Sequence, residues 1–443
     1  MASFDDLTPE RAVQYVQECT SIFSSQDQLQ VLEINQADGE GYVNHLYKVW
    51  NQNGRTVVIK QAKPYLSFVG ADTSIPVSVE RNRIEADAYR IRSAIVPQYL
   101  LEILHKDPDN NLFIQEYSAS PSLRMQLRNG LEFPHFPRLI GEYIARSSFY
   151  TSEIFLDQSA HKLLEAKFTN SGMRRIMEGI LFEFAKFGTS EDIAKFLQTH
   201  HDFLPGLQAD KQLLMEILAL RDIFMKKSEC LAHGDLHTSN ILIAQNNLVV
   251  FDMEYAHIGA FSGDIGYLCG NLIFPYVGWL FRYDKTEEER DRYRRTLLSY
   301  ISEIVDTFVN TFRNLWACDA KPIYKNTPEY MELLFKDLIS EVAGFMGTQG
   351  FTRVVYHSGV QDFELIKSKQ NLEKARALII VISSALIKQR RNLHTIDQVL
   401  RLIEGVTHDF LQTFSRLDSG EKRFFNAHSS ERVTTHSLQK ELA

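Results

Sequence analysis

Alternation of apolar and polar residues predicts a β-rich segment near the start of the chain. Strands are expected at residues 29–35, 43–50, 56–60, 99–104 and 112–117. Asn53-Gly54 supplies the turn between the second and third strands, so these two run antiparallel. A helical period predicts one helix from residue 80 to 91 or beyond. Pro64 and Pro76 indicate an irregular segment before that helix, over residues 62–79.

From residue 118 onward, apolar residues recur with the period of helices. Helices are expected at residues 137–151, 171–187, 192–200, 210–227, 286–316, 328–346, 368–389 and 395–414. Residues after Asp418 are polar and lack periodicity. We therefore predict an α+β fold with a small lobe of antiparallel sheet plus helix (1–117), a large, mostly helical lobe (118–418) and a polar tail (419–443).

One segment of the helical part, residues 231–259, places polar side chains around two short apolar strands. The strands are expected at residues 241–243 and 248–251, joined by the turn Gln245-Asn246-Asn247. Because the strands of a hairpin are antiparallel, residues before the first strand and after the second emerge at the same end. Four side chains are therefore expected to converge: Asp235, Asn240, Asp252 and Glu254.

These side chains have the chemistry that phosphoryl transfer requires. One carboxylate orients the attacking hydroxyl, and a set of acid and amide oxygens holds magnesium on the phosphates. An Asp, an Asn five residues later and an Asp closing the next hairpin reproduce the spacing of kinase catalytic loops. We predict that Asp235 is the catalytic base and that Asn240 and Asp252 bind magnesium. The alternative is that all are solvated loop residues.

A phosphate-binding arrangement is expected in the small lobe. Gly39, Gly41 and Asn44 lie in a loop between two strands, where glycines let the backbone approach phosphates closely. Lys60 ends the strand one hairpin later, within reach of nucleotide phosphates. A hairpin turn and a solvated strand edge are the alternative explanations. The order of glycine hairpin, strand lysine and acidic helix is typical of the small lobe of a kinase.

Three further positions follow from this arrangement. Glu85 is predicted to pair with Lys60 and orient it, although the spacing leaves Glu80 open as the alternative. Glu116 and Tyr117 follow the last strand, where the pattern changes to helix. Their backbone groups are expected to face the adenine of ATP.

His233 and Asp264 are candidates for supporting the loop at residues 233–240. Asp264 precedes an apolar stretch, where a buried carboxylate would accept hydrogen bonds from the backbone of that loop. A helix N-cap is the alternative role. The sequence leaves both roles open.

The composition argues against several classes of protein. Of the 443 residues, 44% are hydrophobic and 23% charged, which is typical of an ordinary globular protein. The net charge of −8 and the absence of a Lys/Arg run argue against nucleic-acid binding. The four cysteines form no CxxC pair, so neither a zinc site nor a disulfide framework is expected. With no secretory leader and no apolar run of about 20 residues, we expect a cytoplasmic protein without a membrane partner.

Several motifs resemble known kinases. The loop HGDLHTSN (233–240), Asp252 and Lys60 resemble the kinase-like superfamily of small-molecule phosphotransferases, which includes aminoglycoside and choline kinases. The resemblance is closer to the 5-methylthioribose kinase family, and it is carried by VIKQAKPYLSFVG, RIEADA, HGDLHT, Asp252-Met253-Glu254 and GDIGYLCGNLI. These segments occur in the family's order over most of the chain.

The resemblance implies a bilobal, protein-kinase-like fold that uses ATP and magnesium, and it suggests a homodimer. It makes Asp235 the catalytic base, and Asp252 and Glu254 the magnesium ligands. The residues that it assigns to the ATP phosphates are Lys60, Gly39, Gly41 and Asn44.

Three positions depart from the family pattern. Ser239-Asn240 stands where the family has Gly-Ser, which adds an amide ligand for magnesium. Met253 replaces the proline of Asp-Pro-Glu. The family places paired arginines near its substrate, whereas this chain has Thr352-Arg353, so only Arg353 carries over as a substrate-binding residue.

We therefore expect an ATP-dependent kinase for a sugar hydroxyl, with methylthioribose or a close analogue as the acceptor in methionine salvage. A kinase for another polyol, amino alcohol or aminoglycoside is the alternative within the same class. Outside it, His233, Asp235 and His237 form an HxDxH cluster that would serve a metal-dependent hydrolase. An inactive nucleotide-binding module is a third hypothesis, against which the complete set of kinase residues speaks.

Overall fold

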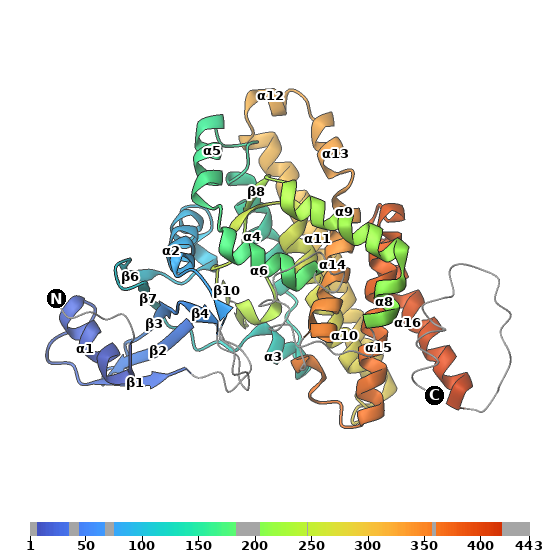
Figure 1. The fold of residues 1–443 in the computed structure, drawn as a ribbon, viewed down its shortest axis with the longest axis horizontal. Coiled ribbons are helices and arrows are strands. Elements are labelled where there is room, and N and C mark those ends of the chain that lie inside the picture. Colours follow the sequence, from blue (N-terminus) through green and yellow to red (C-terminus); the bar gives the residue numbers. More distant parts are fainter. Residues whose placement is uncertain are drawn as a thin grey trace.

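The N-terminal part of the chain forms a five-stranded antiparallel sheet. The computed structural model describes residues 7–34, 44–66, 75–182, 204–245, 247–356 and 360–418. The strands lie in the order β1 (Leu29–Glu33), β2 (Asn44–Asn51), β3 (Thr56–Ala62), β7 (Leu112–Glu116) and β6 (Ile103–Asp107). Every neighbouring pair is antiparallel. Figure 1 shows this sheet at one end of the molecule, with the helical part beyond it.

Two helices cover the two faces of the sheet. Successive residues of a strand point to opposite faces, and β7 is buried on both. Leu112 and Ile114 pack in the core that α1 (Pro9–Cys19) closes. Phe113 packs in the larger core, together with α2 (Glu80–Ser93). The predicted α+β fold, with sheet plus helix first and a mostly helical remainder, is confirmed.

Two predictions in this part were wrong in detail. The strand predicted at residues 99–104 begins only at Ile103, because Pro97 starts a 3-10 turn, Pro97–Tyr99, in which its fixed φ is favourable. The segment predicted to be irregular contains a pair of two-residue strands, β4 (Tyr65–Leu66) and β5 (Ile75–Pro76).

The rest of the chain is mainly helical, as its period predicts. Its helices are α3 (Leu123–Arg128), α4 (Phe136–Tyr150), α5 (Gln158–Lys167), α6 (Ser171–Phe182), α8 (Leu204–Ala209), α9 (Lys211–Lys226), α10 (Phe261–Leu280), α11 (Glu287–Asp319), α12 (Pro322–Lys325), α13 (Glu329–Phe335), α14 (Leu338–Phe351), α15 (Lys369–Gln389) and α16 (Ile396–Asp418). Short turns follow α14 and precede α15, at Thr352–Tyr356 and Gln361–Phe363 (η6).

One predicted helix is divided in the structure, and two predicted segments cannot be compared with it. The single helix predicted at residues 328–346 is two helices, α13 and α14, because the chain turns at Lys336 and Asp337 before α14 enters the core. The helix predicted at residues 192–200 and the tail at 419–443 lie outside the described residues. The lobe boundaries at residues 117 and 418 stay predictions.

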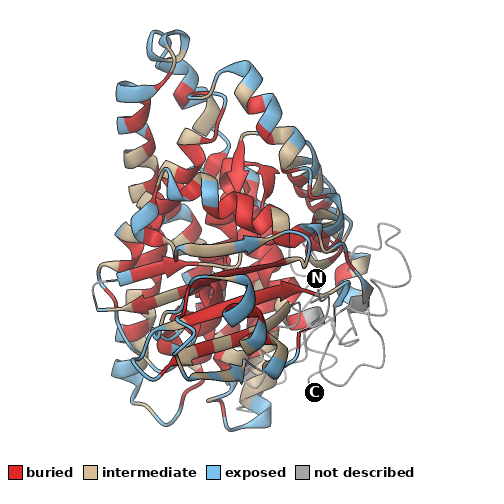
Figure 2. Ribbon diagram, turned by 90° about the vertical axis from the view of Figure 1, so that its left-hand side faces the viewer, coloured by how far each residue is buried: buried red, intermediate tan, exposed pale blue. Residues whose placement is uncertain are grey.

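Helix α10 is the centre of the helical part. It is apolar around its whole circumference, which is typical of a helix buried on all sides. Helices α11, α14 and α15 pack around it, and α11 also packs along α4. Figure 2 shows the buried interior continuing from these helices into the sheet. Helix α10, which directly follows residues 231–259 in the chain, is therefore held rigidly by its neighbours.

The predicted hairpin is present, and a second strand pair accompanies it. β9 (Ile241–Ala244) and β10 (Asn247–Val250) pair antiparallel, as predicted. β8 (Cys230–Ala232) pairs with β11 (His257–Gly259), a pairing that the strand pattern did not reveal. The two pairs enclose the loop at residues 233–240 and the segment at residues 251–256 between them.

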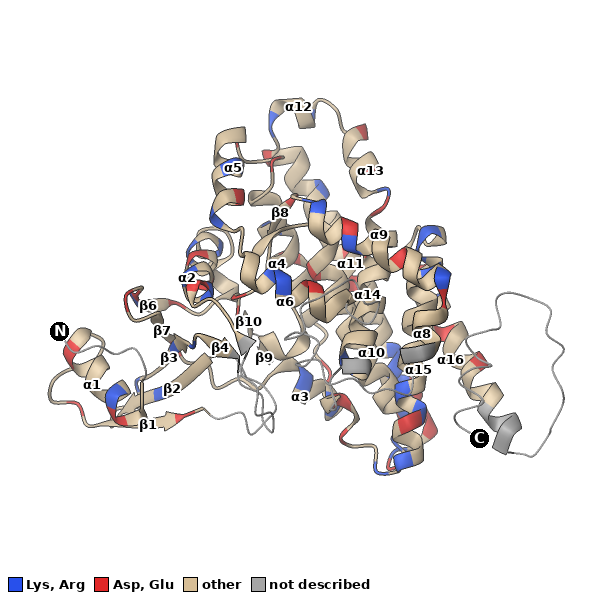
Figure 3. Cartoon of the chain, viewed as in Figure 1, with Lys and Arg blue, Asp and Glu red and all other residues tan. Residues whose placement is uncertain are grey.

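Charged side chains lie mainly outside this core. Lys and Arg are interspersed with Asp and Glu over the labelled elements (Figure 3). Within the described ranges, no helix combines the length and apolar character needed to cross a bilayer.

The crossing of α10 and α14 generates a stability prediction. A Cβ atom at Gly270 would lie 2.7 Å from the Met346 carbonyl oxygen and 2.8 Å from Cγ of Gln349. We expect Gly270→Ala to lower the free energy of unfolding by about 1–3 kcal/mol, because backbone atoms must move to make room. Chemical denaturation followed by circular dichroism measures this change.

Gly263 provides the matched control on the same helix. A Cβ there would meet nothing within 4 Å. Gly263→Ala should leave stability unchanged or raise it by up to about 1 kcal/mol, the usual helix preference for alanine. Equal effects of the two substitutions would contradict the close approach of α10 and α14.

Candidate active site

The loop at residues 233–240 carries Asp235 in the gap between β8 and β9. Gly234 has φ +82, and a Cβ at this position would collide with the Tyr255 carbonyl oxygen. Only glycine combines that backbone conformation with so close an approach. The Asp235 side chain, which follows directly, remains 20% exposed. The loop therefore presents one carboxylate from an otherwise buried turn.

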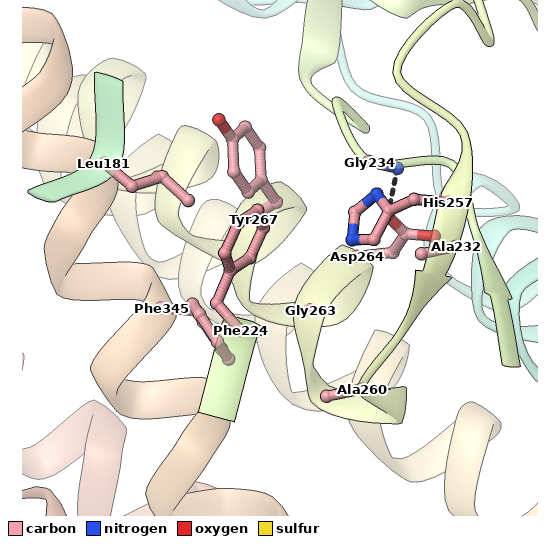
Figure 4. A pocket seen from close by; sticks show the side chains of 10 residues that line it. All are labelled: Leu181, Phe224, Ala232, Gly234, His257, Ala260, Gly263, Asp264, Tyr267 and Phe345. Carbon is pink, nitrogen blue, oxygen red and sulfur yellow. Dashed lines mark hydrogen bonds between the residues drawn. The ribbon is translucent and has the colours of Figure 1, made fainter. Parts of the chain in front are cut away.

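Asp264 anchors the loop from the first turn of α10. Its carboxylate accepts hydrogen bonds from the backbone N–H groups of His233 (2.7 Å) and Gly234 (3.0 Å). Figure 4 shows the contact with Gly234 at the edge of a small cavity whose lining includes His257 and Tyr267 but not Asp235. The N-cap of α10 is Ala260. Of the two roles that the sequence left open, loop support is therefore the one observed.

His233 ties the loop to the end of β10. Its Nδ1 accepts a hydrogen bond from the Asp235 backbone N–H (3.3 Å), and its Nε2 donates to the Phe251 carbonyl (2.9 Å). Burial lowers the pKa of His233, so the ring is neutral, in agreement with this pattern of donor and acceptor. Asn240 adds a third tie, from its Nδ2 to the Asp235 carbonyl (3.0 Å).

The HxDxH cluster is not arranged as a metal site. Both ring nitrogens of His233 are engaged by the backbone. His237 accepts a hydrogen bond from the Ser239 N–H at Nδ1 (3.1 Å), and its Nε2 lies 3.5 Å from Oδ2 of Asp235. The hydrolase hypothesis was therefore wrong, because its first ligand has no free nitrogen.

Lys60 connects the sheet to the hairpin. It lies inside β3, which continues to Ala62, and not at a strand end as predicted. Its Nζ is 2.7 Å from Oε2 of Glu85 on α2 and also contacts Asp252 after β10. Glu80, the alternative partner, instead pairs with Arg83 on the exposed side of α2. Lys60 is thus held by one acid from each part of the molecule.

Glu254 completes an acidic cluster around this lysine. Oxygens of Glu85, Asp252 and Glu254 lie within 4.8 Å of one another. Glu254 accepts hydrogen bonds from Nδ2 of Asn44 (3.0 Å) and Nε of the buried Arg81 (3.2 Å). Sequence reasoning missed Arg81, because it is one of several charged residues at the start of α2 and nothing local marks it as buried.

In this cluster, three carboxylates form ion pairs with two cations, Lys60 and Arg81. Burial raises the pKa of Glu85 to about 8 against the attraction of Lys60, and it raises the pKa of Glu254 as well. Burial opposes ionisation of Asp252 too, but Lys60 holds its pKa below the usual value. Asp252 also has φ +67, a strained conformation for a residue with a side chain. Clustered carboxylate oxygens of this kind fit a hard divalent cation.

Met253 stands where the family pattern has proline, and its backbone makes a contact that a proline could not make. The Met253 backbone N–H donates a hydrogen bond to Oε1 of Glu85 (3.2 Å). A proline there would have no N–H to donate. The departure thus adds a hydrogen bond to the acid that holds Lys60.

Asp235 lies among positively charged groups. Burial raises its pKa to about 7, while the charges of Arg353 and Arg124 favour the ionised form. Arg353 follows α14, and burial lowers its pKa to about 10. The neighbouring Thr352 donates from Oγ1 to the carbonyls of Thr348 (3.0 Å) and Ile180 (3.2 Å). Thr352 therefore closes the helix end, and it does not replace the missing arginine.

A second arginine near Asp235 comes from a distant segment. Arg124 on α3 donates from Nε to Oγ1 of Thr238 (3.3 Å) and from Nη2 to Oδ1 of Asn271 (3.1 Å). It also lies 3.7 Å from Asp362, which belongs to the turn η6 before α15. No sequence motif links α3, α10 and η6, so this group was missed.

The remaining predicted residues are Gly39, Gly41, Glu116 and Tyr117. Gly39 and Gly41 lie outside the described residues. The Glu116 backbone N–H donates to the Glu102 carbonyl (3.0 Å) and is not available to a nucleotide, whereas the expected role of the Glu116 carbonyl stays a prediction. Tyr117 is exposed, with Nζ of Lys48 4.1 Å from its ring centre. Its role stays a prediction, as does magnesium binding by Asn240.

Comparisons with known proteins agree on one enzyme class. Residues 173–304 match the model of the phosphotransferase enzyme family. Methylthioribose kinase 2 of Oryza sativa subsp. japonica is 30% identical over 390 residues, which cover 84% of this chain and 89% of that protein. Methylthioribose kinase of Bacillus cereus (strain AH187) is 29% identical over 385 residues, 86% and 92% of the respective chains.

The solved structures that match the chain are more distant. A choline/ethanolamine kinase family protein from Mesorhizobium loti has a TM-score of 0.41 and 11% identity, covering 89% of this chain and 99% of its own. An amicoumacin kinase has a TM-score of 0.41 and 13% identity, with 85% and 93% covered.

The anchoring of the loop at residues 233–240 can be tested at Asp264. Asp264→Asn should weaken one of its two backbone hydrogen bonds, because an amide has a single acceptor oxygen. We expect about 1–3 kcal/mol lower stability and faster hydrogen exchange at the Gly234 amide. Mass spectrometry of exchange over residues 230–240 measures the local effect. Asp284→Asn, which removes an exposed partner of Arg282, should leave this exchange unchanged; faster exchange in both variants would contradict a local anchor.

Proposed function

The chain belongs to the methylthioribose kinase family, and we propose that it transfers the γ-phosphate of ATP to a hydroxyl of methylthioribose or a close analogue. It is a phosphotransferase with a hydroxyl acceptor, and ATP is its co-substrate. One observation carries the proposal. The contacts of Lys60 with Glu85 and Asp252 bring the predicted phosphate-binding lysine to the hairpin that begins beside Asp235.

The proposed reaction needs one base and one set of phosphate-binding groups. Asp235 orients the acceptor hydroxyl and accepts its proton as the oxygen attacks the γ-phosphorus. The bond between that phosphorus and the β,γ-bridging oxygen breaks, and ADP leaves with the bond electrons. Lys60 holds the phosphates, because Glu85 orients its ammonium group. Positioning and charge neutralisation provide most of the rate in such transfers.

Magnesium fits the acidic cluster. Asp252 and Glu254, with Asn240 from the loop, are the residues that we propose hold it, and clustered carboxylate oxygens support this assignment. When bound, the ion would neutralise phosphate charge. The strained backbone of Asp252 and the hydrogen bonds of Asn44 and Arg81 keep these acids oriented.

The acceptor side favours a neutral sugar over a cationic acceptor. Arg124 and Arg353 both stabilise the ionised form of Asp235. An aminoglycoside or choline would bring positive charge to two guanidinium groups that are already close to the base. A kinase for another polyol is therefore the second candidate function. From the family resemblance we also propose that the protein is a cytoplasmic homodimer.

A screen of acceptors tests the proposal. We expect ATP consumption with methylthioribose, and much less with choline, aminoglycosides or unrelated pentoses. Asp235→Asn should lower kcat by several orders of magnitude, because the amide cannot accept the proton, while a thermal shift with ATP persists. Turnover retained by this variant, or a preference for a cationic acceptor, would contradict the proposed roles.

The pH profile tests the state of Asp235. The active form is the carboxylate, so kcat/KM for the acceptor should be full at alkaline pH and fall as the pH drops below the pKa of about 7. Removing the positive charge in Arg353→Gln should raise that pKa and shift the acid limb to higher pH. An acid limb that stays in place in this variant would show that Arg353 does not act on the base.

A further inference from the structure

We propose that Asp362 binds a second hydroxyl of the acceptor, next to the hydroxyl that Asp235 orients. This inference rests on the proposed sugar kinase function and identifies a residue that determines its acceptor class.

Asp362 is a buried carboxylate with one unsatisfied oxygen. The residue is only 5% exposed, in the turn η6. Among the described residues, Oδ1 has no hydrogen-bond partner. Its nearest cation, Nε of Arg124, lies 3.7 Å from Oδ2, which is too long for a hydrogen bond. Buried polar atoms without partners are uncommon in folded proteins, and each requires an explanation such as a water, an ion or a ligand.

The surroundings connect Asp362 to the catalytic base. Arg124 and Arg353 both act on Asp362, whose pKa burial raises to about 6 against their attraction. The same two arginines favour the ionised form of Asp235. The same two guanidinium groups therefore act on both carboxylates. Arg124 also contacts Thr238, three residues after Asp235 in the same loop, which places Asp362 on the side of the site that this loop borders.

The group is rigid, as a binding site requires. Arg124 is held by Thr238, which belongs to the same loop as Asp235, and by Asn271 of α10. Nδ2 of Asn271 in turn donates to the Tyr267 carbonyl (3.0 Å) and to Oε1 of Gln349 (3.2 Å). The position of Arg124 next to Asp362 is thus fixed by the catalytic loop and the central helix.

The chemistry of this group fits a vicinal diol. Two carboxylates and two guanidinium groups balance in charge, which suits a neutral ligand. A sugar hydroxyl can donate to Oδ1 of Asp362 and accept from a guanidinium N–H at the same time. The neighbouring hydroxyl is then available to Asp235. A ligand with only one hydroxyl leaves Oδ1 unsatisfied and is a poor acceptor.

Steady-state kinetics with matched variants tests Asp362. For Asp362→Asn and Asp362→Ala, we expect KM for methylthioribose to rise about 10- to 100-fold, the loss typical of one hydrogen bond to a charged group. KM for ATP and the thermal shift with ATP should not change. The control is Glu364→Gln, two residues away, where an exposed carboxylate pairs with Arg128; its KM values should equal those of the wild type.

Acceptors that lack one hydroxyl separate binding from a structural role. With wild-type protein, one of the 2-deoxy and 3-deoxy analogues of methylthioribose should lose about 10- to 100-fold in kcat/KM. Asp362→Ala should use that analogue and the parent sugar equally well. A variant that loses the same factor with every acceptor would overturn the inference, because Asp362 would then act only by holding Arg124.

The outcomes also separate this inference from the proposed function. A wild-type protein that phosphorylates methylthioribose, with unchanged KM in the Asp362 variants, overturns the role of Asp362 alone. A wild-type protein inactive on methylthioribose and on every other sugar with a vicinal diol overturns the proposed function and the inference together.

Discussion

A buried ammonium group is central to the contact between the sheet and the helical part of this molecule. Lys60 extends from β3 to Glu85 on α2 and to Asp252 beyond β10. Removing such charges from water costs several kcal/mol for each ion, and only close partners offset this cost. The lysine and its acids must therefore stay together. These are also the groups that we propose for ATP and magnesium, so a contact that joins the two parts also holds the proposed site together.

The loop at residues 233–240 depends on a second constraint, which is that its backbone groups must be hydrogen-bonded. Asp264, His233 and Asn240 each bind main-chain atoms of the loop or of the hairpin end. Gly234 allows the chain to pass against the Tyr255 carbonyl. The carboxylate of Asp235 is thus positioned by groups that lie outside the proposed proton transfer. Its environment then adjusts its pKa, since burial and the nearby arginines act in opposite directions.

The proposed acceptor side of the site differs from the family pattern in sequence more than in the charged groups that it presents. Thr352 stands at one of the two arginine positions and serves the end of α14. Arg124 brings a second guanidinium group to the same region from α3, where Thr238 and Asn271 hold it. Met253 likewise replaces a proline and contributes its N–H to Glu85. In each case a departure in one segment is understood only through its contacts with another.

The sequence by itself determined the features that arise from local interactions. The antiparallel hairpin after Asn240 follows from two apolar strands and a polar turn, and the long helix α11 begins at the capping box of Thr286 and Glu289. Spacing along the chain also narrowed the partner of Lys60 to two acids on α2.

Only the tertiary structure decided which distant groups meet. The choice of Glu85 over Glu80, the burial of Arg81 against Glu254, and the pairing of Arg124 with Asp362 each join segments far apart in the chain. The pairing of β8 with β11 depends on the same kind of contact. Periodicity records which face of an element is apolar, but it holds no information about which other element will cover that face.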